Sequence, residues 1–358
     1  MMKNVFIGLL VFLLVFSFIG CKDDDGNDNE SENNNSGNNP IPDQNWNWTA
    51  VEDTTFGYTS INGVAFGNNT WIAVGYEKIA YSNNGEIWTS VNPSFTGISF
   101  QAIKFGNNTW VAVGYKSDGT VIAAYSSNGI NWTVEEIDVD INYFHDIAYA
   151  NNRWIAVGYY QDNNNNNIHK MIYSDNNGTS WTEVSNTAFN NTGIYSITYG
   201  NNKWVAVGGD GKIAYSTNGV NGWTPVVDSK FDDDYEIIAI AYGNDRFIAA
   251  NSNGKTAYSN NGETWTEFSM NIHNFGSISA ITFRNNRWVI GGFNMAYSNN
   301  GINWTQVTNS TFGITVGTIN TINDIAFGNN KWVAVGRVFS GSLSGPTSTL
   351  GKISYANH

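Results

Sequence analysis

The chain repeats one pattern of apolar and polar positions, and Val64–Thr89 shows it almost in full. A short apolar segment leads into a polar turn, and a nearly continuous apolar run follows. A third segment ends in Tyr-Ser, and an Asn/Gly-rich turn then leads to a Trp-Thr pair. Short apolar runs between Asn and Gly residues predict β-strands joined by tight turns, because both residues tolerate positive φ. Each repeat therefore predicts four short antiparallel strands.

Seven repeats can be recognised, because the second apolar run carries an aromatic residue at the same place each time. That residue is Phe247 in one repeat and tryptophan in the others: Trp71, Trp110, Trp154, Trp204, Trp288 and Trp332. The segment 45–358 then gives about 45 residues per repeat, a period that is typical of β-propeller blades. We predict an all-β fold, a seven-bladed β-propeller of four-stranded antiparallel blades. The predicted blades are residues 60–91, 100–135, 143–185, 194–227, 237–269, 278–308 and 321–356.

The Trp-Thr pairs indicate how the ring closes. Six repeats end in such a pair, but the last repeat stops at His358, before its fourth strand. A seventh pair, Trp48-Thr49, stands alone at the front of the domain. We therefore expect residues 45–51 to supply the outer strand of the last blade, which joins the two ends of the domain and removes open sheet edges.

The residues before the domain predict export and anchoring. Residues 1–20 combine Lys3 with an apolar run from Val5 to Ile19, which is typical of a signal peptide and short for a membrane span. Cys21, the single cysteine, follows directly, and this arrangement resembles a bacterial lipoprotein, whose cysteine is lipidated. An ordinary secretory signal is the alternative. We expect Cys21 to anchor the protein to the outer membrane, at the cell surface or on the periplasmic side.

Residues 21–44 predict a disordered tether. Asn, Asp, Ser and Gly dominate this segment, which has no apolar periodicity and so cannot bury a core. The acidic stretch Lys22–Asp25 resembles the signal that sends some bacterial lipoproteins to the cell exterior, and a solvated spacer explains it equally well.

The turn between the third and fourth strands carries a further resemblance. Its copies read SNNGEIW, SSNGINW, SDNNGTSW, STNGVNGW, SNNGETW and SNNGINW, beginning at Ser82, Ser126, Ser174, Ser216, Ser259 and Ser298. These turns resemble the Asp-box, or BNR, repeat of sialidase-like propellers, with Asn in place of Asp and, in most copies, one residue fewer. In that family the box is a structural turn on the face away from the active site.

The sialidase resemblance implies an active site that this chain does not reproduce. A sialidase needs an arginine cluster for the substrate carboxylate, a tyrosine nucleophile with a carboxylate partner, and an acid/base carboxylate. Four of the five arginines stand in or beside the polar turns, on the opposite face of the predicted ring, and only Arg337 remains. We therefore favour a non-catalytic protein. A glycan-processing hydrolase with an unrecognised active site is the alternative.

Charge and composition exclude some ligands. The formal net charge is −13 and the sequence has no basic patch, so nucleic acid is not expected as a partner. The acidic group at Asp232–Asp234 with Glu236 lacks the spacing of a calcium loop, and the four histidines lack the spacing of a zinc site. We expect no metal, no cofactor, and a monomer held at the membrane by its lipid.

One column of residues suggests a binding surface. Loops of variable length lie on one face of the predicted ring, where binding residues usually occur. Directly after the second strand, tyrosines fill the same position in three neighbouring repeats, and other polar residues stand nearby. The candidate ligand-binding residues are Tyr76, Tyr115, Tyr159, Tyr160, His145, Asp146 and Arg337. Such an aromatic arc suits a glycan or a protein ligand. Alternatively, the tyrosines only pack against neighbouring loops.

Overall fold

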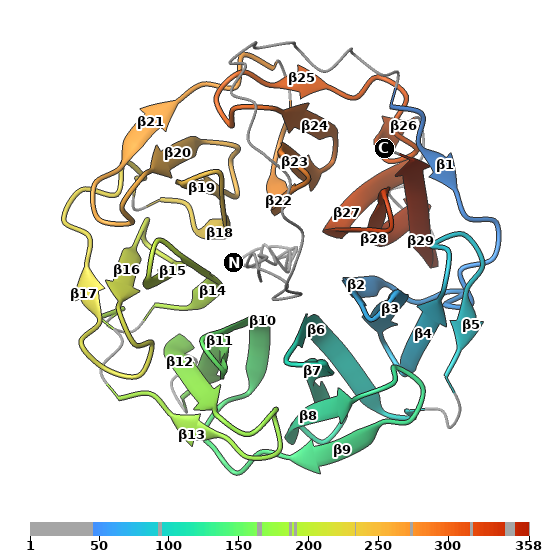
Figure 1. The fold of residues 1–358 in the computed structure, drawn as a ribbon, viewed down its shortest axis with the longest axis horizontal. Coiled ribbons are helices and arrows are strands. Elements are labelled where there is room, and N and C mark those ends of the chain that lie inside the picture. Colours follow the sequence, from blue (N-terminus) through green and yellow to red (C-terminus); the bar gives the residue numbers. More distant parts are fainter. Residues whose placement is uncertain are drawn as a thin grey trace, which may run out of the picture.

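Seven β-sheets form a ring around a central axis in the computed structural model (Figure 1). The structure describes residues 46–91, 95–162, 167–185, 188–189, 192–232, 234–272, 275–315, 318–340 and 348–357. None of these segments forms a helix that could cross a membrane. Consecutive sheets follow one another around the ring, and the first long strand of each lies nearest the axis (Figure 1). The predicted seven-bladed β-propeller is confirmed.

Six of the blades contain four consecutive antiparallel strands. From the axis outward, blade 1 has β2 (Ile61–Gly67), β3 (Thr70–Gly75), β4 (Lys78–Ser82) and β5 (Thr89–Ser90), and blade 2 has β6 (Ile98–Gly106), β7 (Thr109–Lys116), β8 (Val121–Ser126) and β9 (Thr133–Glu136). Blade 3 has β10 (Tyr143–Ala150), β11 (Arg153–Gln161), β12 (Asn167–Ser174) and β13 (Thr182–Glu183), and blade 4 has β14 (Ile194–Gly200), β15 (Lys203–Gly208), β16 (Ile213–Ser216) and β17 (Thr224–Pro225). Blade 5 has β18 (Ile237–Gly243), β19 (Arg246–Asn251), β20 (Thr256–Ser259) and β21 (Thr266–Phe268), and blade 6 has β22 (Ile278–Arg284), β23 (Arg287–Gly292), β24 (Met295–Ser298) and β25 (Thr305–Gln306).

Blade 7 joins the two ends of the domain. It is made of β27 (Thr318–Gly328), β28 (Lys331–Ser340), β29 (Ser348–Asn357) and, on the outside, β1 (Thr49–Ala50). Thr49 pairs with Tyr355 and Ala50 with Ser354, and the next backbone N–H, of Val51, donates to the Ile353 carbonyl at 2.9 Å. The predicted closure by the N-terminal strand is therefore confirmed.

The inner edge of blade 7 carries a fifth strand that the sequence does not predict. β26 (Ile314–Thr315) pairs with the first residues of β27. The repeat pattern offers no place for this strand, because it belongs to the connection between two blades. It adds one short hairpin to this sheet and leaves the order of the other four strands unchanged.

The turns between first and second strands fix the register of every blade. In all seven, both turn residues have positive φ, for example 43° at Asn68 and 56° at Asn69. This is the type I′ geometry that matches the twist of a hairpin. Asn and Asp fill these positions because their short polar side chains tolerate the left-handed conformation better than most others do.

The Asn/Gly turns between third and fourth strands are held by their own side chains. The Gly85 N–H donates to Ser82 Oγ at 2.9 Å, and the Glu86 and Ile87 N–H groups both donate to Asn84 Oδ1 at 2.9 Å. The Trp88 indole N–H closes the turn on the Gly85 carbonyl at 3.2 Å. Only acceptor oxygens of the central side chain are needed here, so Asn can stand where an Asp-box has Asp. We call the side of the ring with both kinds of turn the turn face, and the opposite side the loop face.

The core lies between neighbouring blades. The aromatic residue of each second strand, tryptophan in six blades and Phe247 in blade 5, is at most 1% exposed. An aromatic residue near the end of each first strand packs against the preceding blade. A Cβ added at Gly67 would lie 2.1 Å from the ring of Phe105, and one at Gly328 would lie 2.1 Å from the ring of Phe66. Five of the seven first strands end in glycine because the neighbouring ring occupies the space that a side chain would need.

Basic residues on the turn face connect one blade to the next. The Arg246 guanidinium lies 4.7 Å from the centre of the Tyr258 ring and donates to the Asn300 carbonyl of the next blade at 2.6 Å. Arg153, Lys203 and Lys331 make the equivalent contacts from three other blades. Blade 7 has no such turn, and the cation of blade 6, Arg287, instead lies 4.9 Å from the ring of Trp46. The turn-face arginines that sequence reasoning set aside thus connect blades.

Candidate functional site

Five tyrosines form a crescent on the loop face, across blades 1 to 4. We call Tyr76, Tyr115, Tyr143, Tyr159 and Tyr195 the tyrosine crescent. The Tyr143 ring lies 5.4 Å from that of Tyr115 and 5.6 Å, stacked, from that of Tyr159. Tyr76 continues the row through a β-bridge to Ser99 of blade 2 and is 45% exposed, whereas the other four are half-buried. The structure therefore brings three predicted residues together and adds two more.

Strand register explains why these rings meet. Tyr143 on β10 stands directly opposite Tyr159 on β11, and Ser99 on β6 stands directly opposite Tyr115 on β7. Side chains that face each other across an antiparallel pair are close enough to pack. Tyr160 follows Tyr159 in the same strand, so its side chain points to the other surface of the sheet. The structure does not place Tyr160 in the crescent.

His145 lies beneath the crescent and is only 1% exposed. Its ring centre is 4.6 Å from that of Tyr195, 5.0 Å from that of Tyr143 and 5.5 Å from that of Tyr159. Neither ring nitrogen has a hydrogen-bond partner among the described residues. Burial lowers the pKa of His145 to about 3, so the imidazole is neutral at physiological pH.

Asp146 differs from the expectation, because its carboxylate is buried and turned toward the next blade. One oxygen accepts from the Ile147 N–H at 2.8 Å, and the other accepts from Ser196 Oγ at 2.8 Å and from the Ile197 N–H at 3.1 Å. Asp324 binds the Val64 N–H of blade 1 in the same way, at 3.0 Å. These carboxylates tie neighbouring inner strands together, and we assign Asp146 a structural role.

Lys104 completes a charged group around the axis. We call Lys104, Asp146 and Asp324 the axial cluster; they come from β6, β10 and β27, and each is at most 3% exposed. Burial raises the pKa of Asp146 to about 8 and that of Asp324 to about 6, and the charge of Lys104 opposes both shifts. Burial likewise lowers the pKa of Lys104.

Arg337 belongs to β28 of blade 7, the neighbour of the blade that carries Tyr76. Its Nε donates to Thr321 Oγ1 at 3.3 Å, and its guanidinium lies 4.5 Å from the centre of the Phe339 ring. Among the described residues, no carboxylate forms an ion pair with it. Burial lowers the pKa of Arg337, and the phenol of Tyr143 opposes this shift.

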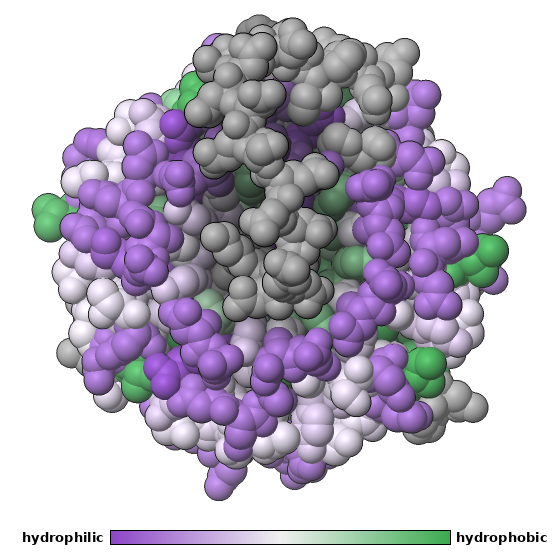
Figure 2. Space-filling model, viewed as in Figure 1, coloured by the Kyte–Doolittle hydropathy of each residue, from purple (hydrophilic) through white to green (hydrophobic). Residues whose placement is uncertain are grey.

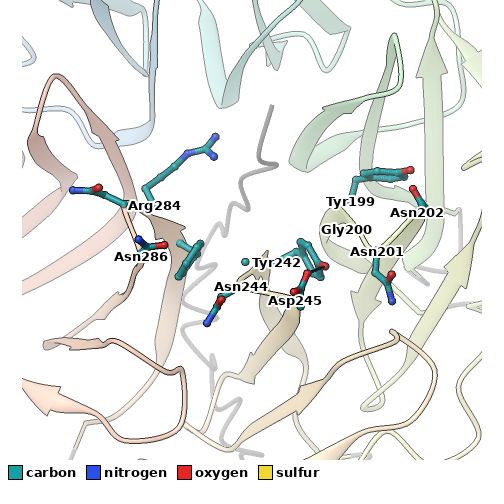
Figure 3. A pocket seen from close by; sticks show the side chains of 12 residues that line it. Tyr199, Gly200, Asn201, Asn202, Tyr242, Asn244, Asp245, Arg284 and Asn286 are labelled. Atoms are coloured by element: carbon teal, nitrogen blue, oxygen red, sulfur yellow. Dashed lines mark hydrogen bonds between the residues drawn. The ribbon is translucent and has the colours of Figure 1, made fainter. Parts of the chain in front are cut away.

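A pocket on the turn face was not anticipated from the sequence (Figure 3). It has a volume of about 680 Å³ and spans the inner turns of blades 4, 5 and 6. Tyr199, Tyr242 and Phe283 supply its rings, and Arg284 extends from its rim toward the axis (Figure 3). Arg284 is the one signal available beforehand, since it replaces the glycine or alanine that ends the other first strands.

The remaining sequence predictions concern the N-terminal segment and metal binding. Cys21 and residues 1–44 lie outside the described residues, as does Asp233 of the acidic loop. Within the described chain, no group of three or more His, Cys, Asp or Glu side chains could hold a metal ion. At the rim of the face seen in Figure 2, hydrophobic residues are scattered among hydrophilic ones.

The fold is shared with known propellers. No family model and no curated protein matches the chain. A structure of YCF48 bound to D1 peptide superposes with a TM-score of 0.62 at 14% identity, covering 89% of this chain and 99% of that one. YCF48 from Cyanidioschyzon merolae gives 0.58 at 16% identity, with coverage of 87% and 99%. Virginiamycin B lyase from Staphylococcus aureus gives 0.58 at 12% identity, with coverage of 86% and 97%. At these identities the likeness shows the β-propeller fold.

Proposed function

We propose that this protein is a non-catalytic binding propeller that holds a polypeptide ligand on its loop face and is tethered to a bacterial outer membrane through lipid on Cys21. The observation that carries the proposal is the tyrosine crescent, whose three central rings pack on one another and whose five members span four blades. Tyrosine offers a large, rigid contact area together with a polar group, and it is enriched in binding surfaces for that reason.

The packing of the crescent favours a polypeptide over a glycan. Sugar rings bind aromatic residues by stacking on a free ring face. Here Tyr143 is packed between Tyr115 and Tyr159, so ring faces within the crescent are turned toward one another. Ring edges and hydroxyl groups remain for a ligand, and these suit the hydrogen-bonding groups of a peptide backbone. The peptide in one of the similar propellers supports the same choice.

The position of Trp46 supports the proposed tether. Its ring lies 5.7 Å from that of Trp332 and 5.0 Å from that of Tyr297, next to the turns of blades 6 and 7. Trp46, the first residue that the structure describes, therefore lies at the turn face, and the crescent lies on the opposite side. About 25 residues separate Cys21 from Trp46, which limits the distance from membrane to domain to roughly 85 Å. A lipid on Cys21 would leave the crescent facing away from the membrane.

Alanine at Tyr76, Tyr115 and Tyr159 together should weaken peptide binding by about 100-fold or more, because hot-spot aromatic residues carry much of the energy of an interface. Binding of fluorescent peptide pools to the full chain, with a glycan array run in parallel, measures the effect. Ile87→Ala, which removes an exposed apolar side chain on the turn face, is the control and should bind as the parent does. Binding of glycans alone would refute the polypeptide ligand, and unchanged peptide binding by the triple variant would refute the site.

Replacing Cys21 with Ser should move the protein from the membrane fraction to the soluble fraction, because the serine hydroxyl does not accept the lipid and two or more acyl chains are needed for stable anchoring. Fractionation of the source cells and mass spectrometry of the mature N-terminus measure this. Ser36→Ala, in the same segment, should stay with the membrane. A parent protein that is already soluble and carries no lipid would contradict the proposed anchor.

A further inference from the structure

We infer that the ligand presents a carboxylate to the loop face beside the tyrosine crescent, where Arg337 receives it and His145 provides a further polar contact. This inference rests on the proposed binding function and specifies the chemistry that the site recognises. The carboxylate can come from an Asp or Glu side chain or from a peptide C-terminus.

Arg337 is the first observation. Its guanidinium is half-buried, packs on Phe339 and uses Nε for Thr321. A partly desolvated cation gains most from an anion that can bind two of its N–H groups at once, and a carboxylate has that geometry. The other loop-face cations are already engaged. Lys78 and Lys352 donate to backbone carbonyls, and Lys116, Lys170, Lys212 and Lys255 pair with acidic side chains.

His145 is the second, independent observation. Both of its ring nitrogens are buried, and neither finds a hydrogen-bond partner among the described residues. Buried polar groups in folded proteins are nearly always satisfied, so an exception points to a bound water or a ligand group. A neutral imidazole always carries one N–H donor, which can bind a carboxylate oxygen directly or through a water.

Tyr143 connects these two residues. Its ring packs against His145 at 5.0 Å, and its hydroxyl donates to Gln101 Oε1 at 2.7 Å. The positive charge of Arg337 is close enough to oppose the rise that burial causes in the pKa of Tyr143. Acidic groups lie at the two ends of the crescent instead. The charge of Glu77 raises the pKa of Tyr76. Burial, together with the charges of Glu236 and Asp210, raises the pKa of Tyr195. A ligand carboxylate is therefore repelled by these acidic groups and attracted by Arg337.

The test uses four pools of short fluorescent peptides that differ in two features. One fixed internal residue is Glu or Gln, and the C-terminus is a free acid or an amide. The full chain should bind a carboxylate-bearing pool at least about tenfold more tightly than the Gln amide pool, which corresponds to one charge-assisted contact. The stronger of the two single-carboxylate pools identifies the source of the group.

Three variants show whether the named residues are responsible. Arg337→Gln should abolish the preference, whereas Lys78→Gln, a cation on the same face that is held by a carbonyl, should retain it. His145→Phe should reduce the preference. Equal binding of all four pools, or an equal loss in Lys78→Gln and Arg337→Gln, would overturn the carboxylate site while leaving the polypeptide ligand in place. A failure of every pool to bind would instead overturn the proposed function.

Discussion

A chain that begins at Thr54 should not fold into a stable domain. It lacks β1 and the two tryptophans before it, Trp46 and Trp48, which are only 4% and 6% exposed. Loss of a buried aromatic side chain costs about 3–5 kcal/mol, and a typical domain is stable by about 5–15 kcal/mol. Removing both, together with the outer strand of blade 7, should therefore exhaust the stability of the ring and leave β29 as an open, aggregation-prone edge.

Thermal unfolding followed by circular dichroism measures this effect. The matched control is a chain that begins at Asn45. It keeps Trp46, Trp48 and the pairing of β1 with β29, and it should melt at the parent temperature. Trp48→Ala in the full chain should give an intermediate loss, because the backbone pairing of β1 with β29 remains. Cooperative melting of the Thr54 chain at the parent temperature would show that blade 7 does not depend on β1.

Replacing Lys104 with Met should destabilise the domain by about 3–5 kcal/mol near pH 8, because two buried carboxyl groups would lose their cation. The loss should be much smaller near pH 5. The pKa values of Asp146 and Asp324 are raised to about 8 and about 6, so both groups are largely protonated at that pH and need no cation. Urea unfolding at the two pH values measures the difference.

The sign of this pH dependence follows from linkage. The two aspartates have folded pKa values above the unfolded value, so their contribution to stability is complete below about pH 4 and is lost as the pH rises through about 6 and about 8. The lowered pKa of Lys104 acts in the opposite direction at higher pH. Asp146→Asn with Asp324→Asn should therefore flatten the decline between pH 4 and pH 8. A loss from Lys104→Met that is equal at pH 5 and pH 8 would mean that its aliphatic chain, and not its charge, is what matters. Lys78→Met is the control and should change little at either pH.

The architecture was predictable because equivalent residues recur at the same positions in each repeat. Three features can be found by local pattern and simple counting: the seven polar turns, the aromatic residue of each second strand and the displaced Trp48. Together they predict seven blades and the closure of the last blade by the N-terminal strand. β26 escaped prediction because it pairs only with an extension of β27 that no other blade has.

The site was predictable only in part. Tyr76, Tyr115 and Tyr159 occupy the same position of three neighbouring repeats, so the repeat pattern identifies them. Tyr143 and Tyr195 belong to first strands, whose residues read as packing, and their role depends on register between strands. Lys104 stands where other blades have small residues such as Ala65 and Ala148. The sequence therefore shows that Lys104 is unusual. Its partners, Asp146 and Asp324, come from blades 3 and 7, and only the closed ring brings the three together.

The route by which the chain enters the ring has a mechanical consequence. Any force applied through the N-terminal segment reaches the domain at Trp46, where the ring of that residue stacks with Tyr297 and lies under Arg287. β1 continues the same path and runs antiparallel to β29. A pull away from the turn face therefore loads the hydrogen bonds of β1 in shear, all at once, and does not peel them one by one. Under tension the stacked group at Trp46 bears the load first, and rupture begins at the outer strand of blade 7.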